Sequence, residues 1–245
     1  HAQQVIDALN SGKNVFVEKP LALTLDELDE IDTSYHKANK SNTVRLMVGF
    51  NRRYAPHVVK MKKLLDSHRS PKSIIMTVNA GAIPSEHWVQ DPLIGGGRII
   101  GEGCHFIDLI RHLVGHKITN FQATMMGNVP GVEVREDKAS ITLSFEDGSF
   151  GTIHYLANGG SAFPKERIEV FCDNAVLQMD NYRVLTGYGW PGFKKMKLFK
   201  QDKGQKACAK AFVDSISNGA EAPIPYEEVM ESSRVSIEVA NALRG

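Results

Sequence analysis

Long hydrophobic runs and an excess of charge of one sign are both missing from this sequence. No stretch approaches the roughly 18 consecutive apolar residues of a transmembrane helix, so we expect no membrane span. The lysine and arginine residues number 29 and the aspartate and glutamate residues 28, for a formal net charge of +1. Because there is no basic stripe either, the sequence argues against nucleic acid or an anionic membrane as a partner.

Cysteine is scarce as well. Cys104, Cys172 and Cys208 show no spacing typical of a metal site, and an odd number of cysteines argues against a disulfide framework. We therefore expect ordinary reduced thiols and no metal. No secretory signal peptide is visible in the sequence.

Apolar residues make up 42% of the 245 residues, enough for a sizeable core in one large domain or one and a fraction. Residues 1–50 have a βα pattern, with strands expected at Val15–Val17 and Thr43–Phe50 and a helix at Leu25–Lys40. A buried parallel strand needs parallel neighbours, and the chain begins inside a helical pattern. We therefore expect a C-terminal piece of a longer chain, whose missing part holds most of the parallel sheet.

The remaining residues, 51–245, read as an α+β domain in which a mostly antiparallel sheet is covered by helices on one face. If the other face is apolar, it should be an oligomer interface. We expect strands at Ser73–Asn79, Thr119–Met126, Lys138–Glu146, Ser149–Ala157, Arg167–Cys172 and Ala175–Met179, and helices at Pro56–Ser67, His105–Val114, Lys206–Asn218 and Tyr226–Leu243.

Turn signals predict how two pairs of strands are joined. A two-residue turn at Asp147-Gly148 would place Phe145 opposite Phe150 and Leu143 opposite Thr152. Asp173-Asn174 predicts a second tight hairpin. Residues 181–197 carry aromatic side chains among basic ones, and we interpret them as an exposed loop or an interface segment.

Glu18-Lys19-Pro20 directly follows the first apolar strand. In open α/β sheets the carboxyl end of a strand is where cofactors and ligands bind, so this turn presents an amine at such an edge. Tight strand-end turns are also where cis proline bonds occur, and we predict one between Lys19 and Pro20. The alternative is an ordinary solvated lysine at a strand end.

A glycine-rich loop runs into a helix over Gly95–Asp108, which reads G-G-G-R-I-I-G-E-G-C-H-F-I-D. His105, Asp108 and His112 share one helical stripe, but they lack a fourth ligand for a metal site. The glycines do not form a nucleotide fingerprint, because no strand precedes them and the third glycine is absent. The alternative for His105 is a buried helix histidine bonded to a carbonyl.

These motifs together resemble the glucose-fructose oxidoreductase / inositol dehydrogenase / rhizopine-catabolism (Gfo/Idh/MocA) family of nicotinamide-dependent dehydrogenases, and Asn51-Arg52-Arg53-Tyr54 is similar to that family too. The resemblance implies that residues 1–50 are the remnant of a dinucleotide-binding Rossmann domain. It implies that residues 51–245 form a substrate-binding and oligomerisation domain with C-terminal helices. It also implies NAD or NADP as cofactor, contacted by Glu18, Lys19 and Pro20, and a homo-oligomer formed through the open sheet face.

In that family the lysine of E-K-P touches nicotinamide and substrate, and a helix histidine serves as acid/base. The resemblance thus assigns catalytic roles to Lys19 and His105, with Asp108 in support. An aspartate usually precedes the histidine by four residues, where this sequence has Gly101. Either Glu102 supplies that carboxylate, or the histidine works without one. The pattern G-R-I-I-G-E-x-C-H-F also resembles a subgroup joined to a zinc-type alcohol dehydrogenase module, so a fusion or partnership with an upstream module is expected.

The chemistry of alcohol oxidation suits these residue types. Hydride leaves carbon for the nicotinamide while a base removes the hydroxyl proton, and histidine has a side-chain pKa of about 6.5. A lysine with a lowered pKa can bind the alkoxide. For substrate contacts we expect Trp88 against a sugar face and Arg53 or His87 on its hydroxyls. The alternative is a surface loop in which Trp88 merely packs.

The sequence therefore predicts that the intact chain is a cytoplasmic NAD(P)-dependent oxidoreductase that acts on a secondary alcohol of a sugar, cyclitol or related substrate. We expect this portion alone to be inactive. The alternative is a non-catalytic binding or oligomerisation module, in which the loss of the aspartate at Gly101 marks a lapsed active site. An open cleft shared by Lys19 and His105 would favour the enzyme. A filled cleft, or a separation too long for one substrate to bridge, would favour the module.

Overall fold

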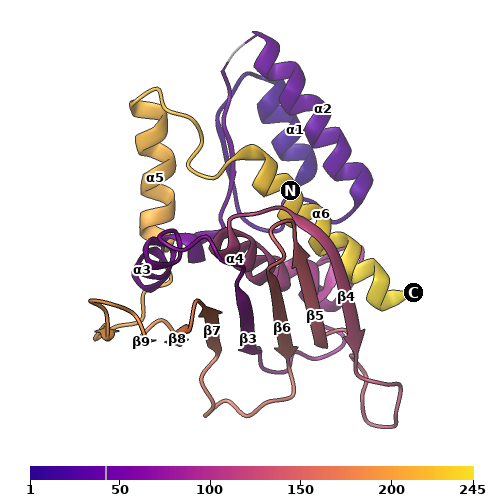
Figure 1. Ribbon diagram of the computed structural model, residues 1–245. Coiled ribbons are helices and arrows are strands. Elements are labelled where there is room, and N and C mark those ends of the chain that lie inside the picture. The colour runs from indigo at the N-terminus through magenta and orange to yellow at the C-terminus, as the bar shows by residue number, and fades with distance from the viewer. Residues whose placement is uncertain (42) are drawn as a thin grey trace.

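The computed structural model describes residues 1–41 and 43–245. The first 50 residues form a small α/β unit, drawn in indigo in Figure 1. Strands β1 (Val15–Val17) and β2 (Leu46–Val48) pair in parallel, and Val15 lies opposite Leu46. Helices α1 (Ala2–Asn10) and α2 (Leu25–Ser41) pack against each other beside them. This arrangement confirms the predicted Rossmann-like βα pattern, although the second strand is shorter than expected.

The second unit is built on an eight-stranded sheet with the order β10-β9-β8-β7-β3-β6-β5-β4. The pair β3–β6 is parallel and every other neighbouring pair is antiparallel, which confirms a mostly antiparallel sheet. The strands are β3 (Ser73–Asn79), β4 (Ile118–Met125), β5 (Lys138–Phe145), β6 (Phe150–Leu156), β7 (Glu166–Cys172), β8 (Ala175–Asp180), β9 (Val184–Tyr188) and β10 (Lys195–Lys197).

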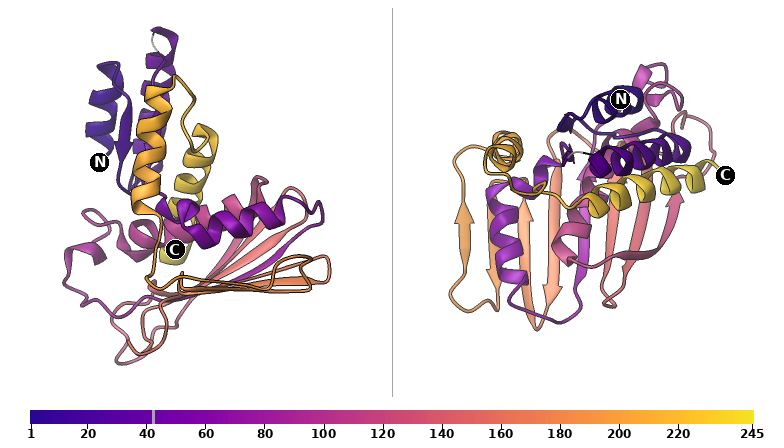
Figure 2. Two further views of the ribbon diagram at one scale, coloured as in Figure 1. Left: turned by 90° about the vertical axis from the view of Figure 1, so that its left-hand side faces the viewer. Right: turned by 90° about the horizontal axis from the view of Figure 1, so that it is seen from above.

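Helices cover one face of this sheet and leave the other open, as Figure 2 shows. Helices α3 (Pro56–Leu65) and α4 (Cys104–Val114) lie on the covered face, while α5 (Gln205–Ser217) rises away from the sheet. Helix α6 (Tyr226–Arg244) packs against α4 and β4 in one unit and against α2 and β2 in the other. The described helices include none with the length and apolar content needed to cross a membrane.

The open face of the sheet carries partly exposed apolar side chains. Ile75, Phe150, Leu156 and Phe171 are between 36% and 45% exposed. Phe150 and Phe171 lie opposite Ser73 from its two neighbouring strands, and Ile75 lies two residues along β3, so these three are close together; Leu156 lies at the other end of β6, opposite Asn79. An apolar patch of this kind is unusual on a surface that stays in contact with water.

The register of the β5–β6 hairpin differs from the prediction by one residue. Ser144, not Phe145, lies opposite Phe150, and Leu143 lies opposite Gly151. The cause is a three-residue turn, in which the Phe145 amide donates to the carbonyl of Ser149 and Gly148 adopts a φ of 84°. A glycine in this conformation is typical of three-residue hairpin loops. The predicted hairpin at Asp173-Asn174 is confirmed, with both residues at positive φ.

The interpretation of residues 181–197 as an exposed segment is wrong. They contribute strand β9 and the edge strand β10, and Tyr182, Trp190 and Phe193 are buried. The turns between these aromatic residues interrupt the period-two pattern that marks a half-buried strand. The Lys19–Pro20 bond is cis, as predicted.

Candidate active site

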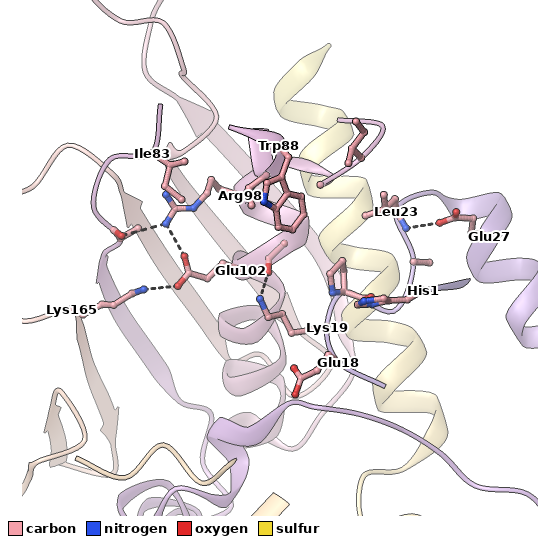
Figure 3. Close-up of a pocket in the computed structure, with 17 residues that line it drawn as sticks. His1, Glu18, Lys19, Leu23, Glu27, Ile83, Trp88, Arg98, Glu102 and Lys165 are labelled. Atoms are coloured by element: carbon pink, nitrogen blue, oxygen red, sulfur yellow. Dashed lines mark hydrogen bonds and ion pairs between the residues drawn. The ribbon is translucent and has the colours of Figure 1, made fainter. Parts of the chain in front are cut away.

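A cavity of about 670 Å³ lies between the α/β unit and the glycine-rich loop. Figure 3 shows Arg98, Glu102 and Lys165 on one side of it, Leu23 and Glu27 on the opposite side, and Lys19 between them. Its remaining lining residues are His1, Glu18, Pro20, Ala22, Ala80, Ile83, Trp88, Val89, Ile94, Gly95 and Gly101. The predicted residues Glu18, Lys19, Pro20, Trp88 and Glu102 are thus brought together.

The strand-end turn aims Lys19 at the glycine-rich loop. Lys19 Nζ donates a 2.6 Å hydrogen bond to the backbone carbonyl of Gly101. Beside it, the Glu18 carboxylate lies against Gly49, where an added Cβ would sit 3.1 Å from Oε2. Downstream, Thr24 Oγ1 accepts from the amide of Glu27, and Glu27 accepts from the amide of Leu23. These caps fix the start of α2 and the turn that precedes it.

The carboxylate of Glu102 is held by three donors. Tyr155 Oη donates at 2.6 Å, Lys165 Nζ at 2.7 Å and Arg98 Nη2 at 2.8 Å. Burial alone would raise the pKa of Glu102, but these hydrogen bonds hold it well below its usual range. Glu102 is therefore a permanently ionised anchor for the loop and a poor proton acceptor.

Sequence reasoning missed Arg98, Tyr155 and Lys165. Arg98 and Glu102 are four residues apart, the spacing of a helical ion pair, and that signal could have been read. Tyr155 on β6 and Lys165 before β7 are far away in the sequence, and only the fold brings them to Glu102.

His105 is not among the residues that line the cavity, whereas Lys19 is. It follows the π-helical turn Ile99–Gly103 and begins α4 as its second residue. The imidazole is 6% exposed and packs edge-on against Phe50, and its Nδ1 has no hydrogen-bond partner among the described residues. Burial, with the positive charges of Arg52 and Lys19, lowers the pKa of His105 well below 6.5. The ring is therefore neutral at pH 7, and the charge of Lys19 acts on it directly.

The structure does not bring Arg53 or Asp108 to this cavity. Arg53 Nε and Nη2 donate to the two carboxylate oxygens of Asp108 at 2.9 and 2.6 Å, and Nη1 donates to Glu228 on α6. Arg53 and Asp108 are both buried. The expected contact of Arg53 with substrate is corrected accordingly, because its guanidinium is already occupied. Asp108 lies one helical turn after His105 on the same face of α4, and its carboxylate contacts Ser232 of α6.

The cysteines are free and buried, as expected. One group that the sequence analysis did not foresee is His68, Cys172 and Asp173, whose ligand atoms lie within 4.8 Å of one another. His68 Nδ1 already contacts Asp173 Oδ2 at 2.8 Å. None of the three residues lines the cavity, and Cys172 and Asp173 lie at the β7–β8 turn.

Two family models match the chain. The oxidoreductase family with an NAD-binding Rossmann fold matches residues 1–50, and the GFO/IDH/MocA C-terminal domain matches residues 58–178. The oxidoreductase YrbE of Bacillus subtilis, itself uncharacterized, is 30% identical over 250 residues, covering 96% of this chain and 70% of that protein. The fold and site thus define a nicotinamide-dependent oxidoreductase. The chain belongs to the GFO/IDH/MocA family, which confirms the resemblance found in the sequence.

Other relatives place the chain among dehydrogenases. Myo-inositol 2-dehydrogenase of Thermotoga maritima is 27% identical over 191 residues, covering 76% of this chain and 55% of that protein. The solved levoglucosan dehydrogenase, in complex with NADH and levoglucosan, superposes with a TM-score of 0.82 at 20% identity, covering 99% of this chain and 75% of that one. At this identity the superposition establishes the fold alone.

Proposed function

We propose that this protein oxidises a secondary alcohol of a sugar, cyclitol or related substrate and passes the hydride to NAD or NADP. The observation that carries the proposal is the position of Lys19, which lines an open cavity and bonds to Gly101 on the turn that leads into His105. Relatives named for inositol and levoglucosan support this substrate class.

The residues at the end of β1 suit a nicotinamide. Glu18, Lys19 and Pro20 line the cavity at the carboxyl end of a parallel strand, the edge where dinucleotides bind in this fold class. Gly49, after β2, leaves space beside Glu18 that a side chain would fill. When bound, the nicotinamide supplies the hydride acceptor.

Lys19 and His105 divide the handling of the proton. A lysine ammonium has three donors, and the bond to Gly101 uses one of them. The others can hold the reacting hydroxyl and stabilise the negative charge that develops on its oxygen. The neutral His105 ring is the second group in this proposal that can take up the departing proton, although it lies outside the cavity lining. Trp88, which is 61% exposed and lines the cavity, offers a flat surface to the sugar ring.

The open sheet face supports a second part of the proposal, association of this chain with copies of itself. Ile75, Phe150 and Phe171 form an apolar patch that a partner sheet would remove from water. A cytoplasmic location also belongs to the proposal, since three free thiols suit a reducing compartment.

The test combines cofactor binding with turnover. NADH and NADPH are titrated by nucleotide fluorescence into this chain and into a form extended upstream of residue 1, and reduction of NAD and NADP is then followed with myo-inositol, scyllo-inositol, glucose and levoglucosan. We expect saturable nucleotide binding by the extended form and its turnover of at least one cyclitol or sugar. Nucleotide binding without any turnover would contradict the substrate class, and the absence of both would favour a non-catalytic module.

A further inference from the structure

The charges around the cavity are unevenly distributed. Lys19, Arg98 and Lys165 all line it. The carboxylate of Glu102 bonds to Arg98 and Lys165, and Glu18 lies beside Lys19 (Figure 3). Glu27 lies on the opposite side, where its carboxylate caps the backbone amide of Leu23. At the Lys165 end, Arg98 and Lys165 share the single carboxylate of Glu102, so this end of the cavity carries excess positive charge.

Glu102 cannot neutralise this charge alone. Its oxygens already accept from Arg98, Tyr155 and Lys165. Arg98 is buried and also donates to the backbone carbonyls of Ala80 and Gly81, so three of its five N–H donors are engaged. The accessible unused donors belong to the two lysines, which are only partly buried.

Lys165 is the cation best placed to take a new partner. Within the described residues, Glu102 is the acceptor recorded for its ammonium, so two of its three donors remain available. Its side chain is 40% exposed, and the residue lies in the loop between β6 and β7. An ammonium of this kind attracts anions into a cleft and binds them through charge-assisted hydrogen bonds.

We propose that the substrate is an anionic sugar, whose carboxylate or phosphate pairs with Lys165 while the reacting hydroxyl lies at Lys19. Lys165 is then a specificity-determining residue of the site. This inference rests on the proposed dehydrogenase function and narrows its substrate class. Glu102 stays ionised and continues to anchor the glycine-rich loop. The anionic group of the substrate compensates the excess positive charge of Arg98 and Lys165.

The experiment compares substrates that differ at one carbon. Glucose, glucuronate and glucose 6-phosphate, with the corresponding galactose set, are tested for binding through the fluorescence of Trp88 and for turnover with NAD and NADP. The Trp88→Phe variant identifies the signal that comes from the cavity. We expect the favoured anionic sugar to have a Kd and a kcat/KM better than those of its neutral counterpart by about tenfold or more. Comparison of glucuronate with glucose 6-phosphate decides whether a carboxylate or a phosphate is preferred.

Variants at Lys165 separate specificity from folding. Lys165→Gln should reduce the anionic-to-neutral preference toward unity, Lys165→Glu should invert it, and Lys165→Arg should retain it. Lys210→Gln removes a lysine of a surface ion pair on α5 and should leave the preference unchanged. A matching loss for neutral and anionic sugars in Lys165→Gln would overturn the proposal, as would equal binding of both by the native protein. Anion-selective binding without turnover would overturn the dehydrogenase function instead.

Discussion

The ammonium of Lys19 and the backbone carbonyl of Gly101 lie 2.6 Å apart, although 82 positions separate them in the sequence. This bond joins the strand-end turn of the α/β unit to the glycine-rich loop of the sheet domain. It involves the residue that stands where the family aspartate is expected. The lysine is thus positioned by a main-chain oxygen. Because every residue has this oxygen, the bond does not depend on an aspartate side chain at position 101.

Loss of the Lys19 amine should abolish most of the activity and leave the fold intact. We expect Lys19→Ala to lower kcat by roughly 10²–10⁴-fold, the usual contribution of a positioned acid or base. Lys13→Ala, which removes an exposed lysine from the neighbouring turn, is the matched control. Steady-state kinetics and a thermal melt measure the two effects, and an unchanged kcat in Lys19→Ala would exclude a catalytic role.

The glycines of the loop should differ in their tolerance of a side chain. A Cβ at Gly95 would lie 2.5 Å from the Trp88 carbonyl oxygen, whereas at Gly101 the nearest atom is 3.4 Å away. We therefore expect Gly95→Ala to destabilise the protein by about 1–3 kcal/mol, as overpacking does. Gly101→Ala should stay within about 1 kcal/mol of the native protein. Denaturant unfolding of both variants tests this, and equal stabilities would contradict it.

The Arg53–Asp108 pair should matter for stability. Asp108→Asn leaves a buried guanidinium with Glu228 as its remaining charged partner, and breaking such a pair costs about 3–5 kcal/mol. The double variant Arg53→Met/Asp108→Leu should regain most of that loss. Asp214→Asn, in an exposed pair with Lys210, should cost less than about 1 kcal/mol. Urea unfolding gives all three values, and a double variant no more stable than Asp108→Asn would count against this account.

Acid should destabilise the protein through His112. Burial, and then the positive charges of Arg53 and Lys62, lower the pKa of His112 to about 2. In the unfolded chain its pKa is about 6.5, so below that pH the unfolded state binds a proton that the folded state does not. Stability therefore falls as the pH drops through 6.5, by about 2 kcal/mol at pH 5 from this residue.

The pH effect is measured as the free energy of unfolding at pH 7 and at pH 5. His112→Gln should lose less stability over this interval than the native protein does. His36→Gln, at an exposed position on α2, should behave like the native protein. An identical loss in the native protein and in His112→Gln would rule out this origin.

The open sheet face should hold copies of this chain together. Ile75→Glu places a charge in the centre of the apolar patch, and we expect it to shift the oligomer toward the monomer in light scattering coupled to size exclusion. Phe199→Glu is the control, because Phe199 is 93% exposed and lies outside the sheet. A native protein that is monomeric at every concentration tested would contradict the prediction.

The local chemistry of the site could be predicted from the sequence because short segments encode it. An apolar strand followed by Glu18-Lys19-Pro20, and a glycine-rich loop that enters a helix, depend on backbone geometry and propensities acting over a few residues. The same holds for the capping of α2 by Thr24 and for most strands, whose period-two patterns are local. Strands β9 and β10 were missed because the turns at Gly189 and Gly192 interrupt their pattern.

Local sequence sufficed to specify the elements and the groups they present, above all Lys19 and the glycine-rich loop. The pairing of those groups followed from the packing of the folded chain. This packing joined Glu102 to Tyr155 and Lys165, which are distant in the sequence, and it gave the guanidinium of Arg53 to Asp108 and not to the cavity. The physical reason is that a charged side chain takes whichever partner the packing brings within reach, and packing is a property of the whole chain.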